Sequence, residues 1–228
     1  MFLAIVLLVI ASLGWNWCQK FWFVPIKVVT IADQLHYATP ELIKAAVTEE
    51  LKRGFFGLRI GAMRDNLLQV PWVSEVQVQR KWPQTVLLKI SERQPLAIWE
   101  NKGVIDTEGK LFFPANLNNI KDVPEFSGDQ SYVNAMVDTY LRLLAKIKPV
   151  GLSVKRLEIM PDHGWRAMLD NGMYIILGQI ELEERLTRFA LAYGNAKSWI
   201  GNESVQVVDL RYTNGLAVGS MATSWRKN

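Results

Sequence analysis

The chain contains few cysteine and histidine residues, the side chains on which many enzyme and metal sites are built. Its 228 residues include one cysteine, Cys18, and only two histidines, His36 and His163. One cysteine excludes an intramolecular disulfide, and two distant histidines with one cysteine do not provide the ligand spacing of a zinc site. The segment Pro161-Asp162-His163-Gly164 has the composition of a surface turn, which favours an exposed loop over half of a general-base pair.

Motifs for nucleophilic catalysis and for phosphate binding are also missing. No serine lies in a G-x-S-x-G context. Gly54-Phe55-Phe56-Gly57 and Gly61 are rich in glycine, but they lack the strand-glycine-helix context and the lysine of a phosphate-binding loop. We therefore expect no catalytic residue, no cofactor, no metal and no small-molecule substrate.

The densest group of carboxylates lies on a helix that we predict over residues 181–193. Glu181 and Glu184 stand four residues before Arg185 and Arg188, the spacing of ion pairs on a helix surface. We interpret this group as a solvent-facing surface rather than as an acid–base pair.

No charge of one sign dominates the chain. Lys and Arg number 26 against 22 Asp and Glu, and the basic residues are scattered among acidic ones. Proteins that bind nucleic acids usually gather their basic residues on one face or in one run, so we expect no nucleic-acid partner. Hydrophobic residues make up 50% of the sequence, which is enough to form proper cores in one large domain or two small ones.

The longest apolar run lies at the N-terminus. Residues 2–13 are apolar apart from Ser12, and tryptophans on either side of Lys20 resemble the aromatic belt of a membrane interface. We expect residues 1–24 to form a transmembrane anchor. A cleaved signal peptide is the alternative, but it would need a basic residue before the apolar run and a small-residue cleavage site after it.

The next 70 residues show the order strand, helix, helix, strand, strand. Thr39-Pro40-Glu41 has the composition of a helix start, and the turn Trp82-Pro83-Gln84 separates two segments rich in β-branched residues. We expect a β-α-α-β-β domain over residues 25–94. Its predicted elements are a strand over 27–31, helices from 40 to Gly54 and over 62–69, and strands over 73–80 and 85–92.

The remainder indicates an α+β domain over residues 95–220, with a mixed, mainly antiparallel sheet and two helices. Residues 114–130 are polar and contain two prolines and a glycine, so we predict a loop there. Residues 221–228 are left as a C-terminal tail. The predicted strands are 97–100, 103–106, 110–113, 153–160, 165–169, 173–177, 204–211 and 216–219, and the predicted helices are 132–147 and 181–193.

A protein without a catalytic site acts by binding, and residues 211–220 are the candidate surface. A strand at the edge of a sheet leaves backbone groups to which an extended partner can pair. Arg211 and Tyr212 offer large contact areas together with hydrogen-bonding groups, as interface anchors do. The alternative is that Leu216 and Val218 belong to the core and that Tyr212 packs locally.

Several segments along the chain have recognisable motifs. They are Pro71-Trp72-Val73, Arg80 to Thr85, Glu92-Arg93-Gln94-Pro95, Ile105 to Gly109, Val123 to Gly128, Trp165 to Gly178, Glu184-Arg185-Leu186 with Phe189, and Val208 to Val218. The order of elements in the first domain resembles a POTRA domain, and this ordered set of motifs resembles the FtsQ/DivIB family of bacterial cell-division proteins. Two positions depart from that family: Arg59 stands where many members have an acid, and Ser220 where many have an aromatic.

The resemblance implies a non-enzymatic, single-pass protein of the bacterial inner membrane, with most of the chain in the periplasm at the division septum. It would link and recruit septal divisome components, and FtsB, with FtsL, would add a strand at the end of the β domain. The implied contact residues are Arg211, Tyr212, Asn214, Leu216, Val218, Gly219 and Ser220. A POTRA-bearing envelope assembly or translocation factor is the alternative function.

Overall fold

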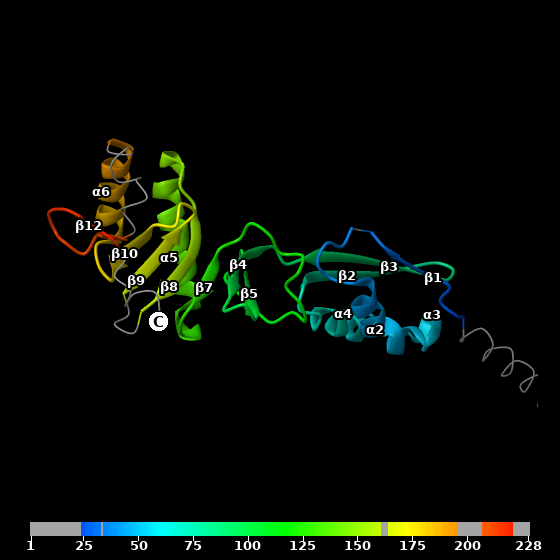
Figure 1. The fold of residues 1–228 in the computed structure, drawn as a ribbon. Helices are drawn as coiled ribbons and strands as arrows, with labels where there is room; N and C mark the ends of the chain where they lie inside the picture. The colour runs from blue at the N-terminus through cyan, green and yellow to red at the C-terminus, as the bar shows by residue number, and fades with distance from the viewer. Residues whose placement is uncertain (1–23, 33, 161–163, 196–206, 221–228) are drawn as a thin grey trace, which may run out of the picture. The chain divides into compact units, whose positions relative to one another are not determined.

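The computed structural model describes residues 24–32, 34–160, 164–195 and 207–220, in two compact units, Met1–Arg93 and Gln94–Asn228 (Figure 1). The segment that we predict to be a membrane anchor and the turn at 161–163 lie outside the described residues. Of the helices within the described ranges, none is both long enough and apolar enough to cross a bilayer.

The first unit contains a three-stranded sheet covered by helices, in the predicted order of elements. The central strand β3 (Thr85–Glu92) pairs in parallel with β1 (Val28–Ile31) and antiparallel with β2 (Val73–Lys81). Helices α2 (Pro40–Leu51) and α4 (Ile60–Leu68) are joined by a short third helix, α3 (Gly54–Gly57), which the sequence pattern did not predict. Figure 1 shows the helices on one face of this sheet.

The start of α2 follows from its sequence. Thr39 takes the extended conformation of an N-cap residue and Pro40 occupies the first turn, where its missing N–H group costs no hydrogen bond. The apolar side chains of both longer helices then meet alternate side chains of the sheet. The buried members of this core are Ile43, Val47, Phe55, Leu58, Met63, Leu67, Val70, Trp72, Val73, Val76, Val86, Leu88 and Ile90.

Glu50, near the end of α2, is a buried carboxylate, with 3% of its surface exposed. Arg59 donates from Nη2 to Oε1 of Glu50 at 2.6 Å, and Nε of Arg53 lies 3.2 Å from Oε2. The hydrogen bond from Arg59 lowers the pKa of Glu50 below its ordinary value, against the opposite effect of burial. Arg59, one of the two departures from the family pattern, therefore compensates a buried charge in this chain.

This pair predicts a loss of stability in acid. Because the pKa of Glu50 is lowered in the folded state, its contribution is present above the ordinary carboxyl pKa and is lost as the pH falls and Glu50 takes up a proton. Thermal melts of the parent and of Glu50→Gln, recorded from pH 7 down to pH 3, test this. The parent should melt higher at neutral pH, and the gap should close in acid. A gap that stays constant with pH would contradict the prediction.

The first unit also predicts that residues 24–93 fold on their own. Their core is internal, and so are their long-range polar contacts: Glu92 accepts hydrogen bonds from the backbone N–H groups of His36, Tyr37 and Ala38. The isolated segment should show one cooperative thermal transition by circular dichroism. A non-cooperative melt of the segment beside a cooperative melt of the longer chain would count against it.

The second unit is built on a nine-stranded sheet in the order β12-β11-β10-β9-β8-β7-β4-β5-β6. Three pairings are parallel, β4 with β7, β7 with β8 and β10 with β11, and the other five are antiparallel. The mixed sheet agrees with the expected α+β class. The strands are β4 (Pro95–Trp99), β5 (Gly103–Asp106), β6 (Leu111–Phe112), β7 (Glu125–Ser127), β8 (Val154–Ile159), β9 (Trp165–Leu169), β10 (Tyr174–Gly178), β11 (Val207–Asp209) and β12 (Ala217–Gly219).

Strand β7 corrects the predicted loop over 114–130. It pairs in parallel with β4 on one side and with β8 on the other, and it is the link between the two halves of the sheet. Phe126, its central residue, is fully buried. Three residues between Pro124 and Gly128 are too few to show an alternating pattern, so only tertiary pairing reveals this strand.

The two predicted helices cover the sheet beside one another. α5 (Val133–Ile147) packs on β8 and α6 (Leu182–Asn195) packs on β10, and the helices contact each other (Figure 1). Both helices bury a stripe at three- and four-residue spacing against the sheet. Members of this shared core with almost no exposed surface include Trp99, Phe126, Met136, Leu143, Leu157, Ile175, Leu186 and Phe189.

Candidate functional site

The expected binding strand lies at an edge of the nine-stranded sheet. β12 is the terminal strand in the order, and it pairs antiparallel with β11 through Asp209↔Ala217, Val208↔Val218 and Val207↔Gly219. Within the described part of the chain, no further strand pairs with the other side of β12. Such an edge can extend the sheet by one strand when an extended segment of another protein pairs with its backbone.

The predicted contact residues divide into two groups around this edge. Leu216 and Val218 are half-buried and pack against the core of the unit, as the alternative interpretation had it. Tyr212 has 59% of its surface exposed and is among the exposed large hydrophobic residues. Four more of the predicted contact residues are also exposed: Arg211, Asn214, Gly219 and Ser220.

Arg211 is exposed but held in place by Asp209. Its Nε lies 3.0 Å from Oδ1 and its Nη2 lies 2.8 Å from Oδ2, and its backbone N–H donates to the same carboxylate. Burial by itself raises the pKa of Asp209, but the hydrogen bonds from Arg211 outweigh it, so the pKa lies below its ordinary value. The guanidinium is therefore pre-oriented, which lowers the entropy cost of using it in an interface.

The loop between β11 and β12 is fixed by arginines of α6. Nη1 of Arg188 donates to the carbonyl oxygens of Tyr212 and Gly215 at 2.5 and 2.8 Å. Nη2 of Arg185 lies 3.4 Å from the carbonyl oxygen of Arg211. Three carbonyl groups of one short loop thus accept from two side chains of the neighbouring helix, and this holds the backbone beneath Tyr212.

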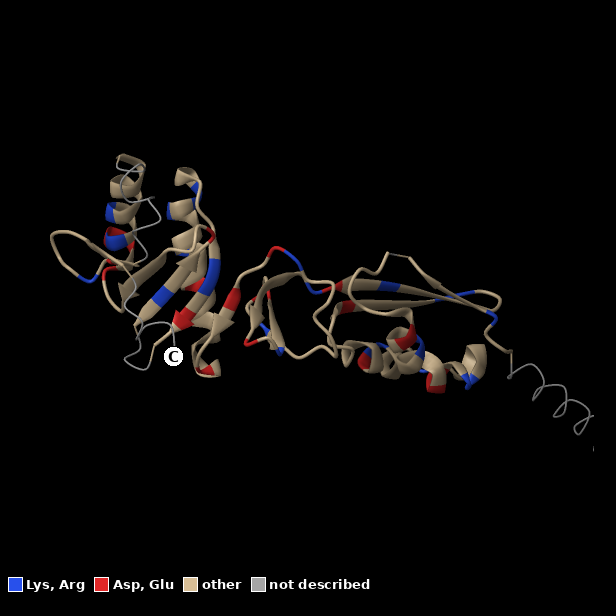
Figure 2. Ribbon diagram, in the orientation of Figure 1, with Lys and Arg blue, Asp and Glu red and all other residues tan. Residues whose placement is uncertain are grey.

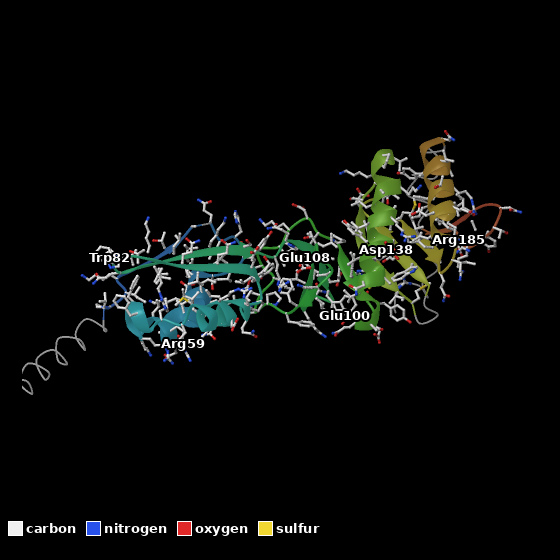
Figure 3. The ribbon with its side chains drawn as sticks, turned by 180° about the vertical axis from the view of Figure 1, so that it is seen from behind. Arg59, Trp82, Glu100, Glu108, Asp138 and Arg185 are labelled. Carbon is white, nitrogen blue, oxygen red and sulfur yellow. The ribbon has the colours of Figure 1, made fainter. Side chains whose placement is uncertain are left out.

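Arg185 corrects the interpretation of this helix as a solvent-facing charged surface. Only 5% of its surface is exposed, and its Nη1 donates to the carbonyl oxygen of Leu177 at 2.7 Å. Its Nε is buried and has no hydrogen-bond partner among the described residues. Glu181 stands 3.9 Å from Nη2, so the ion pair that we predicted is present but long. Figure 3 labels Arg185 beside α6.

Gly178 provides the space for this buried guanidinium. Its backbone has φ +73°, and a Cβ placed there would lie 2.5 Å from Nη1 of Arg185 and 3.2 Å from Cγ of Arg211. A side chain would therefore be disfavoured by both the backbone conformation and the contact with two arginines. The packing of Arg185 and Arg211 therefore explains why the segment from Trp165 to Gly178 ends in a glycine.

Sequence reasoning predicted the pair of Glu181 with Arg185 but missed the burial of Arg185 and the contact of Arg188 with the loop. One signal in the sequence could have revealed the burial of Arg185. Arg185 stands three residues after Leu182 and four before Phe189, which places it on the apolar stripe of the helix and away from the solvent face. A basic residue on that stripe indicates that its charged group is hydrogen-bonded inside the protein, because burying it without partners would cost much free energy.

The side chains that could bind a metal do not gather into a site within the described residues. No group of three or more His, Cys, Asp or Glu side chains that could hold a metal occurs among them. The segment around His163 lies outside the described residues. Charged residues, coloured red and blue in Figure 2, are spread along the ribbons of both units.

Comparison with known proteins identifies relatives over most of the chain. Residues 97–211 match the family model "Cell division protein FtsQ/DivIB, C-terminal", and residues 24–93 match "POTRA domain, FtsQ-type". Similar sequences include the cell division protein FtsQ of Aliivibrio fischeri, 29% identical over 93% of this chain and 82% of the relative. The FtsQ of Allochromatium vinosum is 28% identical over 94% of this chain and 86% of the relative.

Proposed function

Because the chain belongs to the FtsQ/DivIB family of cell division proteins, we propose that it acts in division as a non-enzymatic scaffold that links and recruits septal divisome components. The observation that carries this proposal is the edge strand β12, whose neighbouring loop presents Tyr212 and Arg211 on a backbone held by α6. This geometry favours strand addition by an extended segment of a partner.

The partner segment is an FtsB-like strand, bound together with an FtsL-like chain. It would pair with β12 through its backbone, which requires no particular sequence, while Arg211 and Tyr212 distinguish one partner from another. Asn214, Gly219 and Ser220 complete the exposed rim. Leu216 and Val218 support the strand from the core side.

The scaffold is anchored in the inner membrane by the apolar segment over residues 1–24, with both units in the periplasm at the division septum. The support for this is the apolar run and its tryptophan and lysine border. Alkaline extraction of membranes, followed by N-terminal sequencing of the retained chain, tests the anchor. Recovery of an extractable chain that starts near residue 20 to 26 would show cleavage and contradict it.

Depletion of the protein separates the division role from the alternative role in outer-membrane assembly. A divisome scaffold predicts unseparated filaments on depletion. An assembly or translocation factor predicts a leaky envelope with few outer-membrane proteins and normal septation. The second outcome would overturn the proposal.

A further inference from the structure

The tip of the β2–β3 hairpin carries the most exposed large hydrophobic side chain among the described residues. Trp82 has 79% of its surface in contact with solvent, and Figure 3 shows it at the end of the hairpin. An indole is large and mostly apolar, so leaving it in water gives up the free energy that burial would provide. A side chain of this kind at a projecting turn indicates a surface that another phase or molecule covers.

The chain enters the first unit at this same tip. The backbone N–H of Lys27 donates to the carbonyl oxygen of Gln84 at 3.0 Å, and that of Phe55 donates to the carbonyl oxygen of Val24 at 2.7 Å. Arg80 of the hairpin also donates to the carbonyl oxygen of Leu58, just after α3. The hairpin tip, α3 and the first described residues therefore form one end of the unit, directly after the apolar segment over 1–23.

This end of the unit is basic as well as aromatic. Lys27 and Lys81 are exposed, and no acidic residue occurs in the described stretch 24–32 or between residues 79 and 85. Phe56 on α3 adds a second exposed aromatic ring, with half of its surface in solvent. Figure 2 shows blue segments, which mark Lys and Arg, beside the start of the described chain.

Tryptophan and lysine together are the residues that proteins place at the boundary between a bilayer and water. The indole ring lies at the depth of the lipid head groups, and ammonium groups attract anionic phosphates. A membrane anchor directly before this tip in the sequence would also hold the tip near the bilayer at high effective concentration. The basic residues, the aromatic rings and the position of the expected anchor thus all indicate that this end of the unit contacts an anionic bilayer.

We propose that Trp82, Phe56, Lys27 and Lys81, here named the lipid-contact tip, bind the surface of an anionic phospholipid bilayer. This inference rests on the anchor of the proposed function, because the anchor delivers the tip to the membrane. Contact at the tip would hold the first unit in one orientation at the bilayer surface, whereas the anchor alone would let the unit rotate freely.

Site-specific photo-crosslinking in the full chain tests the lipid-contact tip. Benzoylphenylalanine replaces Trp82 in one variant and, in another, Phe113, an aromatic residue of the second unit with 53% of its surface exposed. Both chains are reconstituted in nanodiscs of phosphatidylethanolamine and phosphatidylglycerol, irradiated, and analysed for lipid adducts by mass spectrometry. We expect lipid adducts at position 82 at roughly ten times the yield found at position 113.

Charge reversal separates binding from mere proximity. Lys27→Glu with Lys81→Glu should lower the adduct yield at position 82 about 25-fold, since each basic residue near an anionic surface contributes about fivefold in affinity. The control pair Lys44→Glu with Lys89→Glu makes the same change in net charge at two positions outside the lipid-contact tip, one on α2 and one on β3. It should leave the adduct yield unchanged. Discs of phosphatidylcholine should lower the yield as the first pair does. Circular dichroism confirms that each variant is folded.

Three results would overturn the proposal. Equal lipid yields at 82 and 113 in a retained chain would place the tip in water while leaving the anchor intact. Equal effects of the two charge-reversal pairs would mean that proximity alone gives the adducts. Protein adducts in place of lipid adducts would assign the tip to a partner chain. Loss of the chain from the discs would instead refute the anchor of the proposed function, and the tip with it.

Discussion

Tyr212→Ala is expected to weaken binding of an FtsB-like strand about thirtyfold and to leave the protein folded. Truncating an aromatic anchor at the centre of an interface commonly costs about 2 kcal/mol, and ~1.4 kcal/mol corresponds to a factor of ten in affinity. The fold should survive because the side chain is mostly exposed and the loop is held through backbone carbonyls, which alanine retains. Isothermal titration with an FtsB-like peptide measures the effect.

Two further variants make this experiment specific. Phe113→Ala removes an exposed aromatic ring elsewhere in the same unit and should leave the affinity unchanged. Arg211→Ala should weaken binding as well, because Ser220 offers less contact area than an aromatic residue would and the pair before the turn must supply more of it. Unchanged affinity in both Arg211→Ala and Tyr212→Ala would place the interface elsewhere, and loss of fold in both would make these residues core.

Arg185→Met is expected to destabilise the second unit by about 3 kcal/mol. The buried guanidinium donates to the carbonyl oxygens of Leu177 and Arg211, and hydrogen bonds from charged groups contribute about 1.5–3 kcal/mol each. Methionine keeps much of the length of the side chain but leaves both carbonyl groups without this donor. Urea unfolding of the parent and the variant measures the difference in free energy of unfolding.

Arg188→Met provides the matched comparison on the same helix. Arg188 also donates to two carbonyl groups of the loop, but it is half-buried, so water can replace it and the loss of stability should be smaller. Both variants should weaken strand binding, because both release the loop that carries Tyr212. Equal stability losses, or an Arg185→Met chain as stable as the parent, would contradict the account of the buried guanidinium.

The sequence predicted the elements that carry their own local signal. The start of α2 at Thr39-Pro40 and the two strands on either side of Trp82 were found because caps, turns and alternation are encoded within a few residues. Boundaries differ by one to a few residues, and Gly54 begins α3 where we expected it to end the preceding helix. The mixed sheet and its two helices follow in the predicted order.

The features that the sequence could not predict depend on distant partners. β7 is a strand only because β4 and β8 lie on either side of it. The role of Arg188 depends on a loop 24 residues further along the chain. The candidate edge could be placed from the last turn and strand alone, but what holds its loop could not. Local patterns therefore predicted where the strand lies, and only the tertiary structure explains its support.

The position of β7 has a consequence for how the second unit folds. The hairpins β4–β5 and β8–β9 join neighbouring segments, whereas β7 pairs Glu125 with Ile98 and with Arg156 over much longer loops. Closing longer loops costs more chain entropy, so the nearby hairpins should form first and β7 should join them late. Truncation of Phe126 should then accelerate unfolding far more than it slows refolding. The strand that joins the two halves of the sheet would thus form after the halves themselves.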